Sequence, residues 1–360
     1  RWFGAGPERA LLRLLGLFDR PAPAPALAAL RAEPQIPGLN EGLAKLTDLE
    51  WNQKLARLRR AGLVAEVNDA DKAEVDAHPL IRDHFGEALR KENEAAWREG
   101  HRRLYEWYAG SAKPLPDTAE EMAPLYAAVL HGCRAGLYQE AFDQVFKKRI
   151  RRFKEHYSIK RLGAFGADLS VLSGFFAEPW MRPVAVLRES DRALLLNEVG
   201  YALRALGRLE EAVGPMQASL AACLAQKDWS NGARGASNLS ELQLLLGQLK
   251  EATESARQAV KLADQSGDAF LRLARRTDLA DALHQGGQTE QAVSLFVEAE
   301  TMQRELQPEF PLLYSLRGYQ YCDLLLARGA TDDVRRRAEQ VLQWRIPEDS
   351  LISIGLEHLC

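Results

Sequence analysis

The sequence has few cysteines, little net charge and no long apolar run. Its 360 residues carry a formal net charge of −3, so no overall positive field attracts nucleic acid. Cys133, Cys223, Cys322 and Cys360 are scattered without a CxxC or other metal-ligand spacing, which favours a reducing, cytoplasmic setting. No stretch approaches the roughly eighteen apolar residues of a membrane span, and none is typical of a signal peptide. We expect a globular protein of two or three domains that does not enter a membrane.

Sequence motifs of catalysis are lacking as well. The chain has no GxSxG, no HExxH and no GxxxxGK[ST], and its seven histidines show no paired ligand spacing. Paired carboxylates such as Glu120 and Glu121 stand at predicted helix starts, where they complement the helix dipole. We therefore predict that this chain is not an enzyme and holds no metal or cofactor of its own.

An internal repeat is the clearest positive signal. One turn motif occurs four times, at Leu206–Ala212, Leu246–Ala252, Gly286–Ala292 and Arg328–Val334, with its glycines 40, 40 and 42 residues apart. An apolar helical stretch lies before and after each copy. A glycine ends the first helix in a left-handed cap, acidic residues begin the second, and a small residue lets the two helices approach. The motif thus predicts consecutive helical hairpins.

These hairpins resemble the tetratricopeptide repeat (TPR), with a period of about 40 residues in place of the usual 34. They are similar to the longer repeats of maltose-regulator-type sensor arrays. The resemblance implies a right-handed α-solenoid over 188–360 with a truncated last repeat. About six surplus residues would lengthen either the helices or the loop between repeats. Gly136 lies out of phase and predicts a degenerate hairpin, with helices at about 119–135 and 138–150, inside a helical connector at 93–187.

Residues 1–92 follow a different pattern. Leucine-rich periodicity predicts a helix over 8–18, a short helix at 25–32 and another helix at 50–61. Residues 63–67 and 73–77 alternate like the strands of a hairpin, and a last helix runs from His78 to about Arg90. Three helices followed by a hairpin are typical of a winged helix. The predicted fold is therefore all-α apart from one small β-wing.

A winged helix could bind DNA through the helix at 50–61, which carries Lys54, Arg57, Arg59 and Arg60. The predicted wing is acidic, however, and would meet phosphate groups with like charge. Its acidic residues are Glu66, Asp69, Asp71, Glu74 and Asp76. DNA binding therefore stays an alternative, and we expect nucleic acid not to be the main partner.

The order of these elements, with the segments LARLRRAGLV and DAHPLIRDHF, resembles signal-transducing NTPases of the NACHT and NB-ARC (STAND) types. In those proteins an ATPase module precedes the winged helix and a repeat array follows it. Both ends of this chain look like cuts, so the resemblance implies an ATPase module with ADP or ATP ahead of Arg1. It also implies a two-state switch that a ligand of the repeats would shift, with self-association on activation. Roles in defence against phage or in transcriptional control are both compatible with that family.

By the same resemblance, His78 would touch ADP bound in the resting state. A ring nitrogen can donate a hydrogen bond to a phosphate oxygen. The simpler interpretation is that His78 caps the helix and Pro79 occupies its first turn. Arg82, one turn later, would form a salt bridge at a domain interface.

A basic run at 147–161 and an aromatic segment at 175–180 give further candidate contact residues. Lys147, Lys148, Arg151 and Arg152 could bind phosphate, nucleic acid or an acidic face of a neighbouring domain. The simpler interpretation is a solvated helix face near a helix C-terminus. Trp180 would either fill a core between hairpin and array or, if exposed, mark a docking position.

The first helix of each repeat carries polar and aromatic residues that we predict to face the concave surface and to contact a protein or small ligand. They are Asn197, Tyr201, Arg204, Asn238, Glu241, Asp278, Asp281 and Tyr319. A solvated helix face has the same composition. We expect the regulatory and sensing region of a STAND-type NTPase. A DNA-binding regulator with a TPR effector sensor and a free-standing TPR scaffold that binds proteins remain the alternatives.

Overall fold

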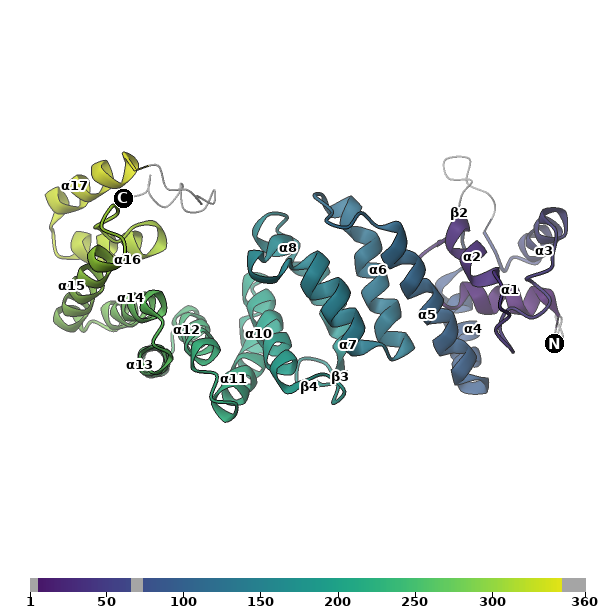
Figure 1. Cartoon of the computed structure of the whole chain (residues 1–360), viewed down its shortest axis with the longest axis horizontal. Helices are drawn as coiled ribbons and strands as arrows, with labels where there is room; N and C mark the ends of the chain where they lie inside the picture. Colours follow the sequence, from purple (N-terminus) through teal and green to yellow (C-terminus); the bar gives the residue numbers. More distant parts are fainter. Residues whose placement is uncertain (1–5, 66–73, 345–360) are drawn as a thin grey trace. The chain divides into compact units, whose positions relative to one another are not determined.

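A computed structural model of the chain is mainly helical and describes residues 6–65 and 74–344 (Figure 1). The chain divides into two compact units, Arg1–Phe175 and Phe176–Cys360. We call them the N-terminal unit and the repeat unit and describe each by itself. The first unit contains the predicted N-terminal domain and most of the predicted connector. Among the described residues, no helix is both long enough and apolar enough to cross a membrane.

The N-terminal unit begins with four helices and two short strands. In chain order these are α1 (Pro7–Leu15), β1 (Ala22–Pro23), α2 (Ala24–Arg31), α3 (Asp48–Arg60), β2 (Glu74–Val75) and α4 (Pro79–Glu92). The helices lie where the periodicity predicts them. Thr47 and Glu50 form a capping box at the start of α3, which satisfies two backbone N–H groups that the first helical turn leaves free.

The strands differ from the predicted hairpin. β2 pairs antiparallel with β1, with Val75 opposite Ala22, although the sequence predicts pairing of 73–77 with 63–67. The N–H of Ala65 donates to the carbonyl of Asp76 at 2.8 Å, so the end of the first predicted strand does reach the second. The rest of the predicted wing, including Glu66, Asp69 and Asp71, lies outside the described residues. The strand β1 could not be predicted, because a two-residue strand beside three prolines has no periodicity.

A leucine-rich core holds these helices together. Its buried leucines include Leu11, Leu12, Leu14 and Leu15 of α1, Leu27 and Leu30 of α2, and Leu55 and Leu58 of α3. At the crossing of α1 and α4, a Cβ built on Gly86 would lie 2.3 Å from the carbonyl oxygen of Gly16. Because this contact joins backbone to backbone, the crossing requires glycine.

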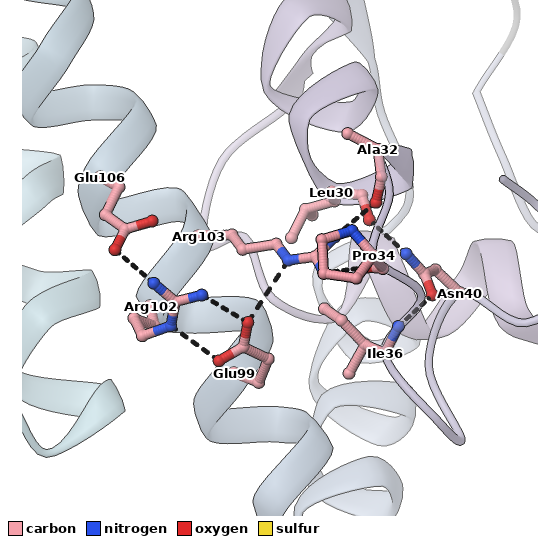
Figure 2. A network of polar contacts seen from close by, with 9 residues as sticks. All are labelled: Leu30, Ala32, Pro34, Ile36, Asn40, Glu99, Arg102, Arg103 and Glu106. Carbon is pink, nitrogen blue, oxygen red and sulfur yellow. Dashed lines mark hydrogen bonds and ion pairs between the residues drawn. The ribbon is translucent and has the colours of Figure 1, made fainter.

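A polar network fixes the next helix, α5 (Glu94–Ser111), to the loop that follows α2 (Figure 2). The guanidinium of Arg103 donates to the carbonyl of Ala32 at 2.7 Å and to that of Pro34, and Glu99 holds its Nε. The fully buried Asn40 bonds one backbone N–H and one backbone carbonyl, at 2.7 and 2.8 Å. These side chains satisfy loop groups that no helix or sheet pairs.

The remainder of the N-terminal unit is helical. It comprises α5, α6 (Ala119–Ala135), α7 (Tyr138–Glu140), the π-helix η1 (Ala141–Ile150), η2 (Phe153–Glu155), α8 (Tyr157–Lys160), α9 (Phe165–Leu172) and η3 (Ser173–Phe175). The predicted hairpin is confirmed, since α6 ends at the predicted residue and Gly136 has a φ of 85°. Its second helix, predicted as continuous over 138–150, is one α-helical turn followed by the π-helix.

The repeat unit begins with the antiparallel strands β3 (Phe176–Glu178) and β4 (Arg182–Pro183) and continues as four helix pairs. The pairs are α10 (Glu189–Ala205) with α11 (Leu209–Ala225), α12 (Trp229–Leu245) with α13 (Leu249–Ser266), α14 (Ala269–Gln285) with α15 (Thr289–Leu306), and α16 (Ser315–Ala327) with α17 (Thr331–Leu342). Helices of the first two pairs have 17 or 18 residues and short links, so the surplus of the long period lies in the helices.

The same turn joins the two helices of every pair. Gly207, Gly247, Gly287 and Gly329 have φ between 72° and 76°. In each turn, the N–H after the glycine donates to the carbonyl five residues earlier, at 2.8 or 2.9 Å, and the glycine N–H to the carbonyl three residues earlier. This is a Schellman motif, and it confirms the predicted left-handed glycine caps.

Candidate ligand-binding surface

The first helices of the four pairs lie next to one another along the repeat unit. α12 packs against both α10 and α14, and α14 packs against α16. Polar side chains bridge each of these contacts. We call the surface formed by these side chains the first-helix face. Seven of the eight residues predicted to face a ligand take part in these contacts, and the eighth, Tyr319, lies on α16.

Two bridges of the same kind recur along this face. Arg204 of α10 forms an ion pair with Glu241 of α12, and His284 of α14 lies 3.4 Å from Asp323 of α16. In both pairs the first partner stands three residues before a cap glycine and the second stands six residues before the next cap glycine. The repeat period therefore sets the position of these polar side chains.

Hydrogen bonds between neighbouring first helices complete the bridging. Their donors and acceptors are Asn238 Nδ2 to Asn197 Oδ1 at 3.1 Å, Ser237 Oγ to Asp278 Oδ2 at 2.7 Å, and Gln320 Nε2 to Asp281 Oδ2 at 3.2 Å. Asp278 also pairs with Arg275 at 3.1 Å. A continuous row of polar contacts thus crosses all four first helices.

Burial raises the pKa of two carboxyl groups in this row. For Glu241 the main cause is burial, which the Arg204 charge opposes and the Asp278 charge reinforces. For Asp281 burial again comes first, and a hydrogen bond from Gln285 opposes it. Both residues are half-buried, and a partly buried carboxylate interacts more strongly with a polar or cationic group than a fully solvated one does.

The two predicted tyrosines differ in their surroundings. Tyr201 lies beneath the guanidinium of Arg204, with 5.1 Å from Cζ to the ring centroid. Tyr319 of α16 is 36% exposed. The structure therefore joins seven of the eight predicted residues through contacts along the first-helix face and leaves Tyr319 accessible at its last helix.

His78 is exposed and caps α4. Its Nδ1 accepts a hydrogen bond from the N–H of Leu80 at 3.3 Å, and Pro79 occupies the first helical position. Arg82 was predicted at a domain interface, but the side chain is 7% exposed and is bonded inside the unit. It pairs with Asp76 and donates to the carbonyl of Asp19 at 3.1 Å. Arg82 thereby ties α4 to the chain just before β1, at Asp19, and just after β2, at Asp76.

The basic run at 147–161 is engaged within the N-terminal unit. Lys147 pairs with Asp143 at 2.7 Å, Arg151 contacts His156 at 2.9 Å, and Arg152 donates to the carbonyl of Pro116 and stacks 3.5 Å from the Tyr157 ring centroid. Arg149 donates to three carbonyls of the α5–α6 link and to one in the last turn of α5. These side chains hold loops in place, and Lys148 of the predicted set is exposed.

Trp180 is half-buried and lies edge-on to Phe176, 5.6 Å between ring centroids. The predicted docking position is thus partly covered by the adjacent hairpin. The basic residues of α3 are also partly engaged, since Lys54 and Arg57 pair with the buried Glu8 at 3.3 and 2.9 Å. In the part of the chain that the structure describes, no cluster of three or more histidine, cysteine or carboxylate side chains could hold a metal ion.

No protein-family model and no curated protein sequence matches the chain. Solved structures are similar to it at low identity. TPR-like repeats of a putative kinesin light chain from Podosopora anserina are 19% identical, with a TM-score of 0.34 over 64% of this chain and 98% of that one. A STAND protein with a tetratricopeptide repeat sensor from Pyrococcus horikoshii is 14% identical, with a TM-score of 0.33 over 98% of this chain and 58% of that one. The apo form of RapI is 9% identical, with a TM-score of 0.43 over 86% and 75%. At these identities the likeness concerns the fold alone.

Several residues of the first-helix face were not identified from sequence. Alignment of the repeats on their cap glycines would have revealed them. Asp323 stands at the same distance from its cap glycine as Glu241 and Asp281, and Arg317 stands at the same distance as Arg275. The signal in the sequence is that residues of the same charge stand at equivalent positions of successive repeats.

Proposed function

We propose that the chain is a non-catalytic sensor region whose repeat unit binds a protein or peptide on the first-helix face. The observation that carries this proposal is the continuous polar row across α10, α12, α14 and α16. It combines half-buried charges, amides and an accessible tyrosine, which are the groups that recognise an extended polypeptide. A solvated helix face does not need charges with perturbed pKa values or bridges that recur with the repeat period.

Binding to this face can be tested by panning a phage-displayed random-peptide library on the purified chain. The variant Tyr319→Ala removes an accessible aromatic side chain from the face. The matched control Val297→Ala changes an exposed apolar residue on the second helix α15. We expect the selected peptides to lose affinity for Tyr319→Ala by about thirtyfold, as for an aromatic anchor, and to bind Val297→Ala as they bind the wild type. Failure to select any peptide, or equal effects of the two variants, would contradict the proposal.

We further propose that residues 6–92 form a winged helix that couples the repeats to an ATPase module encoded ahead of Arg1 in the same reading frame. The element order, with β1 between α1 and α2 and β2 before α4, supports a winged helix. A phosphate-binding GxxxxGK[ST] segment is expected in the preceding sequence. A preceding sequence without a nucleotide-binding module would leave the protein as a free-standing repeat scaffold.

His78 would then report the bound nucleotide. Because its Nδ1 accepts the capping hydrogen bond, the neutral ring carries its proton on Nε2 and can donate there to a phosphate. His78→Asn keeps a good helix cap and removes this donor. In the longer protein with its ATPase module, ADP affinity should fall about tenfold in His78→Asn with little change in thermal stability. Unchanged ADP affinity would restrict His78 to capping.

DNA binding is the weaker alternative, because Lys54 and Arg57 already neutralise the buried Glu8. Substitution of Arg57, Arg59 and Arg60 by glutamine should leave the binding of a mixed-sequence DNA duplex at its weak, nonspecific level. A loss of tight, specific duplex binding in this variant would favour the DNA-binding regulator instead.

A further inference from the structure

Arg317 is a half-buried cation that has no hydrogen-bond or ion-pair partner among the described residues. It lies in α16, where its Cζ is 5.0 Å from the ring centroid of Phe270 and 5.7 Å from that of Tyr314. Its Nε is buried and has no protein acceptor. Other interior arginines of the repeat unit behave differently: Arg337, for example, forms two 2.7 Å hydrogen bonds with Glu300.

The nearest acid does not compensate this charge. Burial lowers the pKa of the Arg317 guanidinium, and the neighbouring Arg275 acts in the same direction, while Tyr314 and Asp278 oppose them. Asp278, however, already accepts from Ser237 at 2.7 Å and pairs with Arg275 at 3.1 Å. The Arg317 guanidinium therefore keeps a positive charge without an ion-pair partner, and of its nitrogen atoms only Nε is fully buried.

Further unpaired polar atoms lie along the same two helices. The buried Nδ1 of His284 and Oε1 of Gln320 lack hydrogen-bond partners among the described residues, as does Nε of Arg317. All three belong to α14 and α16, and Nε of Arg192 is a further such atom in the described part of the repeat unit. Unpaired buried groups of this kind are rare in proteins and need an explanation, of which a missing ligand is one.

The junction of α14 and α16 is also where the repeat becomes irregular. The link between α15 and α16 spans 307–314, longer than the earlier links, and Ser315 enters α16 with a φ of 55°. A serine in the left-handed region is uncommon. The entry leaves apolar side chains beside Arg317, since Phe270 is 47% and Leu316 is 46% exposed. The charge therefore stands beside an accessible apolar surface.

We infer that the surface around Arg317 of α16 and Phe270 of α14 binds an acidic peptide, with one carboxylate of the peptide held by Arg317. This inference rests on the proposed function of the first-helix face. A guanidinium presents two parallel donors that match a carboxylate, and an apolar neighbour of the acidic residue can cover Phe270. Backbone N–H groups of the peptide would donate to the half-buried carboxylate of Asp281 on the same face.

The ligand group carries a single negative charge. One unmatched guanidinium neutralises one carboxylate, whereas a phosphate with nearly two charges would meet repulsion from Asp278 and Asp281. Either an acidic side chain or a peptide C-terminus could supply the carboxylate. Both sources present the same carboxylate group to Arg317. A peptide with an amidated C-terminus distinguishes them, because it can offer only a side-chain carboxylate.

The test uses two positional-scanning libraries of N-acetylated peptides, one with amidated and one with free C-termini. Wild type is compared with Arg317→Gln and with the control Arg234→Gln, which changes an exposed arginine of α12. We expect wild type and Arg234→Gln to prefer aspartate or glutamate at one position, or the free C-terminus, by about tenfold. Arg317→Gln should lose this preference.

Peptides that bind wild type without any acidic or C-terminal preference would overturn the inference while leaving the proposed function intact. Retention of the preference by Arg317→Gln would overturn it as well. If no peptide of either library binds wild type, the proposed function fails and the inference fails with it.

Thermal unfolding gives a readout that does not depend on finding the ligand. Because Arg317 forms no ion pair, its replacement by methionine should not destabilise the free protein, so Arg317→Met is expected to have a Tm at least as high as that of wild type. A selected acidic peptide should raise the Tm of wild type and leave that of Arg317→Met unchanged. A lower Tm for free Arg317→Met would show that Arg317 has a structural role and would contradict the inference.

Discussion

In the N-terminal unit, arginines hold irregular loops in place from distant helices, whereas in the repeat unit one turn is copied from pair to pair. Arg103 and Arg149 donate to carbonyls of loops that precede them by many residues. The repeat unit instead ends every first helix with the same glycine motif. Each glycine turn depends only on residues next to it in the chain, so the same turn can occur in successive helix pairs. The side chains of the first helices are then not needed to form the turns.

The two units also differ in how closely their helices approach. Gly86 and Gly16 place backbone against backbone in the N-terminal unit. In the repeat unit a Cβ on Gly200 would meet Cγ of Met216 at 2.5 Å, which is part of a flexible side chain. A backbone cannot move aside without shifting its helix, but a methionine can change its rotamer.

The largest expected effect tests this difference. Gly86→Ala should destabilise the protein by about 3 kcal/mol or more, because α1 and α4 must separate. Gly200→Ala should destabilise the protein by less, about 1–2 kcal/mol, since the gain in helix propensity offsets part of the cost of repacking the buried Met216. Chemical denaturation of both variants checks the prediction. Equal losses would show that the two crossings are equally rigid.

The second prediction concerns pH. His101 and His131 are buried in the N-terminal unit and share a hydrogen bond of 2.8 Å between their Nδ1 atoms. Burial, with the positive charge of Arg134, lowers the pKa of His131 to about 3, and burial lowers that of His101 well below its usual value. Both rings are therefore neutral in the folded protein at pH values where the unfolded chain binds protons.

The sign follows from linkage. Between pH 6.5 and about 3 the unfolded state binds more protons than the folded state, so stability falls as the pH falls. By pH 5.5 each histidine should contribute a loss of about 1.4 kcal/mol. Glu241 and Asp281 of the repeat unit have raised pKa values and act in the opposite direction, since their contribution is largest at low pH and is lost as the pH rises.

Hydrogen exchange measured at pH 7 and pH 5.5, corrected for the intrinsic exchange rate, separates the two units. Peptides from α5 and α6 should lose protection at the lower pH, while those from α12 and α14 should not. The double variant His101→Phe/His131→Phe should remove the pH dependence of α5 and α6, because no buried histidine is left there to titrate. Equal acid sensitivity of both units would argue against the histidine pair as its cause.

The smallest expected effect concerns the left-handed glycine turn, which occurs in both units. Gly136 ends α6 with the same Schellman motif as Gly247 in the repeat unit. Alanine at either glycine should destabilise by about 1 kcal/mol, because a side chain disfavours the left-handed region, and asparagine should destabilise less. Thermal unfolding of the four single variants measures this. Unequal losses for Gly136→Ala and Gly247→Ala would mean that packing around the turn, and not the backbone alone, sets its contribution.

Much of the fold could be predicted because its signals are local. A glycine followed by acidic residues between apolar stretches specifies a hairpin by itself, so Gly207 and its three equivalents were placed correctly. The strand pairing could not be predicted in this way. β1 has two residues, and its partner Val75 lies more than fifty positions away, so no periodicity links them. The π-helix after α7 likewise follows from packing and not from a pattern of residues.

The candidate site also has features that the sequence predicts and features that depend on the tertiary structure. The sequence by itself determined the helix pairs, their glycine caps, the long period and the polar character of the first helices, because backbone conformation and helix periodicity depend on neighbours in the chain. Only the tertiary structure decided which charges are matched. Arg82, Arg151 and Arg152 look in the sequence like contact residues, yet their partners lie inside the unit. Arg317 resembles them in sequence but lacks a partner, because pairing depends on which side chains packing brings within a few ångströms.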